Sequence, residues 1–151
     1  MSPTTWNNSF SVGIEQIDDQ HKDLFNCIAD LEKSVANPDE KQRWNSIHYS
    51  IMKLQDYVRI HFSVEECLME VLGYPGRAAH IREHNKFVKV VSDLERRSIT
   101  QNNITANEIV EFLRDWLVNH IAVTDQDYSR YFAKAMNNTQ RSPVRPTGLP
   151  D

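Results

Sequence analysis

The most regular feature of the sequence is a run in which mostly apolar residues recur at alternating intervals of three and four positions. Its members are Trp44, Ile47, Ile51, Leu54, Val58, His61, Glu65 and Leu68. This spacing keeps every member on one face of an α-helix, whereas a half-buried strand would need an interval of two. A long helix with one continuous inward face packs against other helices, so the run predicts a helix bundle.

Three further stretches carry helical periodicity. From about residue 18 to residue 36, one face is formed by Leu24, Phe25, Ile28, Leu31 and Val35. After a Gly-Tyr-Pro-Gly break, the next face consists of His80, His84, Phe87, Val91 and Leu94. Polar residues 98–103 close this segment, and the last face consists of Ile109, Leu113, Trp116 and His120. The chain therefore contains four amphipathic segments of similar length.

Local signals mark where these helices begin. Asp18 or Asp19 can cap the first helix, because a short polar side chain there can accept a backbone hydrogen bond. Asn37 followed by Pro38 is typical of a capping residue and a proline at the first helical position. The fourth helix opens with the capping-box pattern Thr-x-x-Glu at residues 105–108.

Four such helices with short connections predict an all-α, up-down-up-down antiparallel four-helix bundle with an N-terminal arm and a short C-terminal helix. Thr124 can cap that last helix, which we expect to end at about residue 136. The 4 Gly and 6 Pro among 151 residues argue against a turn-rich β-sandwich. This length fits one domain, and we expect it to occupy residues 1–136.

The two ends of the chain lie outside the bundle pattern. Residues 1–17 form an arm that is too short to be a domain, and we expect it to lie across the bundle and cover part of its end. Its apolar residues are Trp6, Phe10, Val12, Ile14 and Ile17. Residues 137–151 are almost devoid of apolar side chains, so we expect a disordered tail there.

Charge and cysteine content exclude several classes of function. The 17 basic and 21 acidic residues leave a net charge of −4, which favours neither a nucleic-acid nor an anionic-membrane partner. We find no signal-peptide pattern and no apolar run long enough to span a membrane. Cys27 and Cys67 form no Cys-x-x-Cys pair, so we expect reduced thiols in a cytoplasmic protein.

The histidines indicate where the chemistry lies. Of the 6 histidines, only His48 stands off the inward face of its helix, whereas five occupy inward positions. These five are His21, His61, His80, His84 and His120. Each imidazole brings a donor and an acceptor that need partners away from water, and a shared metal site would take one nitrogen from every ring.

The spacing of the candidate ligands supports such a site. His80 and His84 are four residues apart and share one helical face, as do His61 and Glu65. Glu66 is rotated by about 140° from His61, so we assign Glu65 to the site and Glu66 to the surface.

Asp125 needs a local change in the helix to join this set, because it follows His120 by five residues. The helix must end or distort at residues 121–124 if Asp125 is to point inward, and a cap at Thr124 is consistent with an end. On its own, Asp125 would instead be interpreted as an acidic residue in the first turn of the last helix.

Five imidazoles, two carboxylates and no thiol suit iron, manganese or zinc. Seven protein ligands are too many for one ion and fit two ions that are bridged by carboxylates. The centre also differs from ferritin-like di-iron bundles, because no Glu-x-x-His pair occurs on the inward faces.

In these positions the sequence resembles the hemerythrin family, specifically its single-domain bacterial members. The matching motifs are Asp-x-Gln-His at residues 18–21, His-Phe-x-x-Glu-Glu at 61–66, His-x-x-x-His at 80–84 and His-Ile-x-x-x-Asp at 120–125. The likeness extends from the Trp6 arm to about Tyr131. Each motif is weak alone, but the four in this order and at these separations are specific.

The resemblance implies a non-haem di-iron centre that binds O2 reversibly and transforms no substrate. By analogy, one iron is held by His80, His84 and His120. The other iron is held by His21 and His61 and keeps an open position for O2. Glu65, Asp125 and an oxo or hydroxo group would bridge the two irons.

Reversible binding also needs apolar surroundings that discourage water. The candidates are Leu24, Phe25, Phe62, Trp116, Leu117 and Ile121, which would equally serve as ordinary bundle core. Tyr128 either hydrogen-bonds a ligand or plugs an access path, or is a core tyrosine whose hydroxyl finds a backbone partner.

Other functions remain open from the sequence alone. The protein could be a di-iron oxidase or peroxidase, an iron-handling protein, or an O2 sensor that acts through a partner. Our principal expectation is a monomer that stores O2 or delivers it to an O2-consuming enzyme in the cell. A purely structural bundle would leave five inward imidazoles without a shared explanation.

Overall fold

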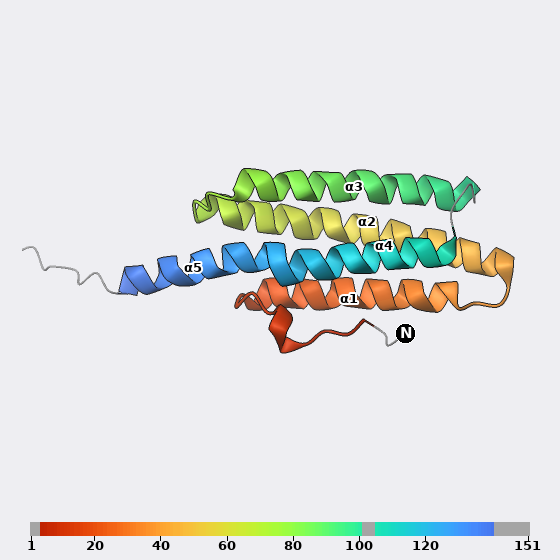
Figure 1. Cartoon of the computed structure of the whole chain (residues 1–151), viewed down its shortest axis with the longest axis horizontal. Coiled ribbons are helices and arrows are strands. Elements are labelled where there is room, and N and C mark those ends of the chain that lie inside the picture. Colours follow the sequence, from red (N-terminus) through yellow and green to blue (C-terminus); the bar gives the residue numbers. More distant parts are fainter. Residues whose placement is uncertain (1–3, 101–104, 141–151) are drawn as a thin grey trace, which may run out of the picture.

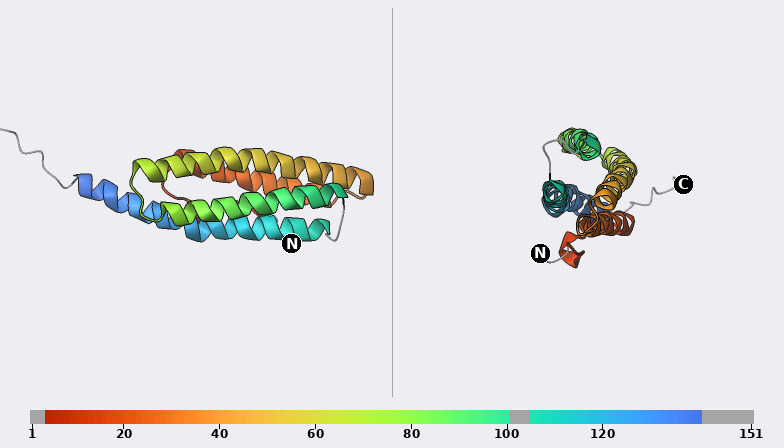
Figure 2. Two further views of the ribbon diagram at one scale, coloured as in Figure 1. Left: turned by 90° about the horizontal axis from the view of Figure 1, so that it is seen from above. Right: turned by 90° about the vertical axis from the view of Figure 1, so that its right-hand side faces the viewer.

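The structure, a computed structural model, describes residues 4–100 and 105–140. Four helices run alongside one another in alternating directions (Figure 1): α1 (Glu15–Val35), α2 (Glu40–Val71), α3 (Arg77–Thr100) and α4 (Ala106–Asn119). The fourth continues through a π-helical turn, η2 (His120–Thr124), into α5 (Asp125–Gln140). No strand occurs in the two described ranges. The predicted all-α, up-down-up-down bundle is thus confirmed, and Figure 2 shows its helices around a common interior.

The N-terminus of α1 differs from our expectation. The helix begins at Glu15, and its capping position is Ile14, which offers no side-chain hydrogen bond. Asp18 lies in the first turn and accepts hydrogen bonds from the Val12 amide at 2.8 Å and the Ser11 hydroxyl at 2.5 Å. The predicted cap at Asp18 or Asp19 is therefore wrong, because the arm folds back and occupies the Asp18 carboxylate.

The start of α2 is also displaced from the predicted signal. Asp39, not Asn37, caps this helix, and its carboxylate accepts a hydrogen bond from the Gln42 amide at 2.8 Å. Asn37 accepts one from the Asp39 amide at 3.0 Å, which leaves Pro38 before the helix. The predicted capping box of α4 is confirmed, since both of its reciprocal hydrogen bonds are present.

The N-terminal arm lies beside α1 and reaches one end of the bundle (Figure 1). Along α1, the rings of Trp6 and Phe10 pack on Phe25 with centroid distances of 5.9 and 5.0 Å. A short 3-10 turn, η1 (Asn8–Phe10), precedes residues that approach the fourth helix. There the Gln126 amide donates to the carbonyl oxygen of Phe10 at 3.3 Å. The arm therefore joins α1 to the segment that follows α4.

Two apolar clusters divide the interior. The larger lies between the four helices and includes Leu24, Ile51, Val91 and Leu113. The smaller lies where α1 begins and α5 follows the bundle, and consists of Val12, Ile17, Met69, Tyr128 and Phe132. Along α1, His21 falls between the two clusters, so the chain reserves a polar layer between two apolar ones.

The last helix is longer than expected. α5 runs to Gln140, so residues 137–140, which we expected to be disordered, are helical. The rest of the expected tail, residues 141–151, lies outside the described residues, as do residues 101–103 of the polar segment after α3. Among the helices that the structure describes, none is long and apolar enough to cross a membrane.

Candidate metal centre

All seven predicted ligands meet in the polar layer between the two apolar clusters. They are His21 on α1, His61 and Glu65 on α2, His80 and His84 on α3, His120 on η2 and Asp125 at the start of α5. Their exposed fractions lie between 0% and 3%. Each of α1, α2 and α3, and the segment that continues the fourth helix, therefore contributes at least one buried nitrogen or oxygen ligand atom to this layer.

The π-helical turn explains how Asp125 points inward. Its backbone amide donates to the carbonyl of His120, five residues earlier, which is the hydrogen bond of a π-helix. The wider turn places residues five apart on the same face. The predicted distortion is thus confirmed, but the helix does not end. Thr124 is no cap, because its hydroxyl donates to Glu83 Oε2 at 3.0 Å.

The donor atoms form two overlapping groups, and within each group they lie within 4.8 Å of one another. We call the set of His80, His84, His120, Glu65 and Asp125 the three-histidine group. The set of His21, His61, Glu65 and Asp125 is called the two-histidine group. Both carboxylates belong to both groups, whereas each imidazole belongs to only one.

Asp125 directs its two oxygens to opposite groups. Oδ1 lies 3.2 Å from His80 Nε2 and 3.1 Å from His120 Nε2, in the three-histidine group. Oδ2 lies 3.1 Å from His21 Nε2, in the two-histidine group. This division is what a carboxylate needs to bridge two cations.

Glu65 is divided in the same way. Its Oε1 contacts His61 Nε2 and lies 3.8 Å from His21 Nε2, whereas its Oε2 lies 3.6 Å from His80 Nε2. The two carboxylates therefore each face both groups, Glu65 from α2 and Asp125 from α5.

Several of these buried atoms have no hydrogen-bond partner, which fits a metal-binding role. They are both nitrogens of His21, both oxygens of Glu65, both oxygens of Asp125 and Nε2 of His80. Burying polar atoms without partners is costly, and cations bound by them would remove that cost. Five imidazole nitrogens and two carboxylates form a donor set that suits iron, manganese or zinc.

His84 and His120 show the same need for a cation. Each donates its Nδ1–H outward, to Glu66 at 2.8 Å and to Glu83 at 3.1 Å. Their Nε2 atoms therefore point inward, and these two atoms lie only 3.2 Å apart. A cation coordinated by both nitrogens fits this close approach.

The electrostatics of the layer favour positive charge. Burial acts to lower the pKa of His21 and His80, but the nearby carboxylates of Asp125 and Glu65 raise both to about 9. Burial lowers the pKa of His84 to about 3 and keeps that ring neutral. Burial alone would raise the pKa of Glu65, but the charge of His61 and its neighbours holds it well below the usual range. In the absence of metal, protons on His21 and His80 thus supply positive charge that bound cations would supply instead.

Three outer hydrogen bonds were missed by the sequence analysis. Gln20 Oε1 accepts from His61 Nδ1 at 2.7 Å, and Glu66 and Glu83 accept from His84 and His120. The assignment of Glu66 to the surface is wrong in this respect, since only 27% of its side chain is exposed. Each of the three acceptors is adjacent in sequence to a ligand, and this adjacency is the signal that could have identified them.

The predicted apolar surroundings of the site belong to the larger cluster. Its members Leu24, Phe25, Phe62, Leu117 and Ile121 are buried, and Trp116 packs against them half-buried. Phe62 stacks on His84 with centroids 3.7 Å apart, and Trp116 stacks on His120 with centroids 4.5 Å apart. These two rings therefore cover the three-histidine group.

Tyr128 lies on the other side of the polar layer. It is fully buried, its ring centroid is 5.6 Å from that of His80, and its hydroxyl has no hydrogen-bond partner. A backbone partner is therefore not what holds this hydroxyl. Burial, with the charges of Glu65 and Asp125, raises the pKa of Tyr128 well above its usual value, so the hydroxyl keeps its proton.

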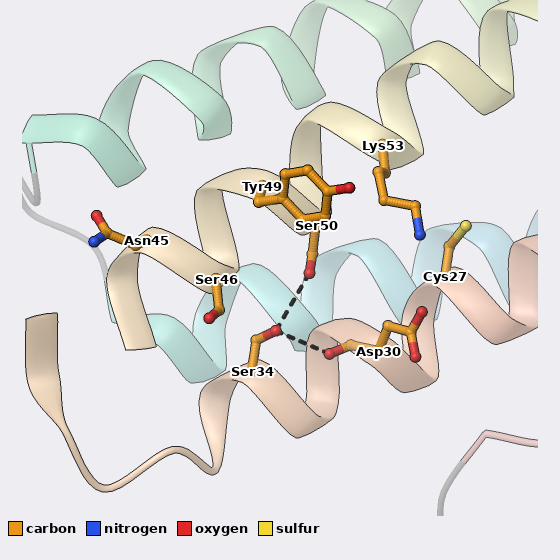
Figure 3. Close-up of a pocket in the computed structure, with 8 residues that line it drawn as sticks. All are labelled: Cys27, Asp30, Ser34, Asn45, Ser46, Tyr49, Ser50 and Lys53. Atoms are coloured by element: carbon orange, nitrogen blue, oxygen red, sulfur yellow. Dashed lines mark hydrogen bonds between the residues drawn. The ribbon is translucent and has the colours of Figure 1, made fainter. Parts of the chain in front are cut away.

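A separate hollow lies between α1 and α2 (Figure 3), with a volume of about 410 Å³. It is lined by Cys27, Asp30, Ser34, Asn45, Ser46, Tyr49, Ser50 and Lys53. Across it, the Ser34 and Ser50 hydroxyls hydrogen-bond at 3.2 Å. None of its lining residues belongs to either ligand group, so the hollow is not part of the metal centre.

Known proteins are similar to this chain in sequence and in fold. Residues 12–132 match the family described as Hemerythrin HHE cation binding domain. A bacteriohemerythrin of Methylococcus capsulatus is 35% identical over 129 residues, which cover 85% of this chain and 95% of the relative. Another, of Stenotrophomonas maltophilia, is 33% identical over 141 residues, which cover 93% and 89%. A wild-type hemerythrin crystal structure matches with a TM-score of 0.75 and 34% identity, covering 84% of this chain and 95% of that one.

Proposed function

The chain belongs to the hemerythrin family, and on that premise we propose that it binds O2 reversibly at a non-haem di-iron centre. The observation that carries the proposal is the position of the two carboxylates, each with one oxygen toward each histidine group. When bound, the two irons would supply the electrons with which O2 is held and would take them back when O2 leaves. No other substrate enters this chemistry.

The proposed ligand assignment follows the two groups. His80, His84 and His120 would hold one iron, and His21 and His61 would hold the other. Glu65 and Asp125 would supply carboxylate ligands to both irons. The two-histidine group contributes one nitrogen fewer, and this difference leaves room for O2 on that side.

The residues around the layer keep water away from it. Leu24 and Phe25 follow His21 on α1 and are buried, and Trp6 from the arm packs on Phe25. We propose that this apolar wall, with Leu117 and Ile121, admits O2 to the two-histidine side and discourages water and protons. Phe62 and Trp116 do the same at the three-histidine side. The protonated Tyr128 hydroxyl closes the layer toward α5 and is placed to donate a hydrogen bond to a ligand carboxylate.

Storage or delivery of O2 inside the cell is the role that we infer for such a site. An oxidase or peroxidase would consume a reductant over many turnovers, and a sensor would need a partner to transmit its state. Steady turnover of a reductant, or steady release of peroxide, would therefore favour an enzyme over an O2 carrier.

One experiment tests metal identity, stoichiometry and O2 chemistry together. Metal analysis of the purified protein is combined with optical spectra of the reduced protein in deoxygenated and then in aerated buffer. We expect two irons per chain and a visible charge-transfer band that appears with O2 and disappears on deoxygenation. A colourless protein that retains two zinc ions would contradict the proposal.

A further inference from the structure

Three imidazoles of the centre donate a hydrogen bond from their outer nitrogen, Nδ1, to a side chain on the preceding helix of the bundle. Gln20 on α1 accepts from His61 on α2, and Glu66 on α2 accepts from His84 on α3. Glu83 on α3 accepts from His120 on η2. The bonds form a chain of contacts from α1 to the fourth helix, and each one fixes which nitrogen of the ring faces the centre.

Helix geometry explains why these residues hold that position. Gln20 precedes His21, Glu66 follows Glu65, and Glu83 precedes His84. Successive residues of an α-helix are rotated by about 100°, so a neighbour of an inward ligand points sideways toward the adjacent helix. A ligand and its sequence neighbour therefore serve two different histidines.

The acceptors differ in charge between the two groups. In the three-histidine group, His84 and His120 donate to the carboxylates of Glu66 and Glu83. In the two-histidine group, His61 donates to the neutral amide oxygen of Gln20, and His21 Nδ1 has no partner. A carboxylate acceptor attracts the proton on the outer nitrogen and makes the inner nitrogen a stronger metal ligand. A neutral amide acceptor has a much smaller effect.

From this difference we propose that Gln20, Glu66 and Glu83 are positioning residues that set unequal metal affinities in the two groups. Glu66 and Glu83 strengthen the three-histidine group, so it holds its cation tightly. The neutral Gln20 keeps the two-histidine group the weaker and more exchangeable position. The inference rests on the proposed di-metal site, and it adds which position fills first and which residues decide this.

The test is a titration of the metal-free protein with Co2+, followed by calorimetry and by the visible spectrum of bound Co2+. We expect two separate binding steps. Gln20→Glu should tighten the second step by about 10-fold and leave the first unchanged. Glu83→Gln should weaken the first step by about 10- to 100-fold and leave the second unchanged, because outer hydrogen-bond partners affect metal affinity on this scale.

The variants separate charge from packing and from ligand number. The three-histidine group has one nitrogen more, so unequal steps in the parent protein do not by themselves support the proposal. Glu83 also accepts from Thr124, and Glu66→Gln repeats the charge change without touching that bond. Glu111→Gln on the exposed face of α4 is the matched control for loss of one negative charge. Circular dichroism of each metal-free variant checks that it folds.

The outcomes distinguish this inference from the proposed function. If Gln20→Glu shifts both steps equally, or if Glu66→Gln and Glu83→Gln behave like Glu111→Gln, the inference is overturned while O2 binding stands. If the Co2+ steps respond as expected but the iron-loaded protein shows no reversible O2 band, the proposed function fails and the inference stands.

Discussion

At the scale of single residues, the two nitrogens of an imidazole perform separate tasks. In His61 the outer nitrogen is engaged by Gln20, and the inner nitrogen faces Glu65 within the two-histidine group. A buried imidazole needs a partner for each of its two nitrogens, and a bound cation can serve as the inner partner. The same logic makes His48 different, since it stands away from both ligand groups.

Replacement of His61 by Ala should therefore weaken one metal position and spare the other. It removes a nitrogen from the two-histidine group and leaves the three-histidine group intact. We expect metal content after dialysis to fall from about two ions per chain toward about one, because a group with one imidazole holds metal poorly. Metal analysis measures this, and His48→Ala is the control that should retain both ions. Unchanged content in His61→Ala would show that the assignment of His61 is wrong.

At the scale of helices, the fourth helix is the element whose local geometry the site depends on most. Its π-helical turn contains one residue more than an α-helical turn over nearly the same length. This turn brings Asp125 beneath His120 and lets Thr124 reach Glu83. The distortion is therefore part of how the helix supplies two ligands to one layer.

Deletion and insertion at Val123 test this role of the turn. Val123 is 55% exposed, so its loss removes little packing. Deleting it leaves the ligands four residues apart, which also aligns them on a regular α-helix, so metal binding should persist. Inserting one Ala after Val123 adds a rotation of about 100° and should abolish metal binding at both groups, since Asp125 belongs to both. Co2+ titration reads out both variants, and metal binding that persists after the insertion would show that the alignment of Asp125 with His120 has no such role.

The helices also show how much of the structure the spacing of inward-facing residues can predict. The inward faces of α2 and α3 were predictable because apolar and ligand residues share one spacing. The caps at Asp18 and Asn37 were not, because the actual partners of these side chains depend on the arm and on Asp39. Gln20, Glu66 and Glu83 were missed because a division into inward and outward positions ignores residues that point sideways to the next helix. These contacts depend on which helices are neighbours, and one helix's sequence does not specify that.

At the scale of the whole molecule, the centre separates two apolar clusters and joins all parts of the chain. The arm, α1 and α5 meet in the smaller cluster, whereas the middle of the four helices forms the larger one. The polar layer between them holds together only if its charges balance. Two ionised carboxylates need either protons on imidazoles or cations, so folding, protonation and metal binding are linked.

This linkage predicts opposite pH behaviour with and without metal. In the metal-free protein, the pKa of His21 and of His80 is raised from 6.5 to about 9. A pKa that is higher in the folded state gives stability that is present in full below 6.5 and is lost as pH rises through 9. The loss is on the order of 3 kcal/mol for each imidazole.

We therefore expect the free energy of unfolding of the metal-free protein to decrease between pH 6.5 and 9, as measured by urea denaturation. In the metal-loaded protein cations replace these protons, so that decrease should vanish, and loading at pH 7 should release about two protons. Calorimetry in buffers of different ionisation enthalpy counts those protons, and His48→Ala should behave like the parent protein.

Because protons and cations compete for the same nitrogens, metal retention should weaken as pH falls below neutrality. Identical pH profiles for the metal-free and loaded proteins would contradict the exchange of protons for metal in this layer.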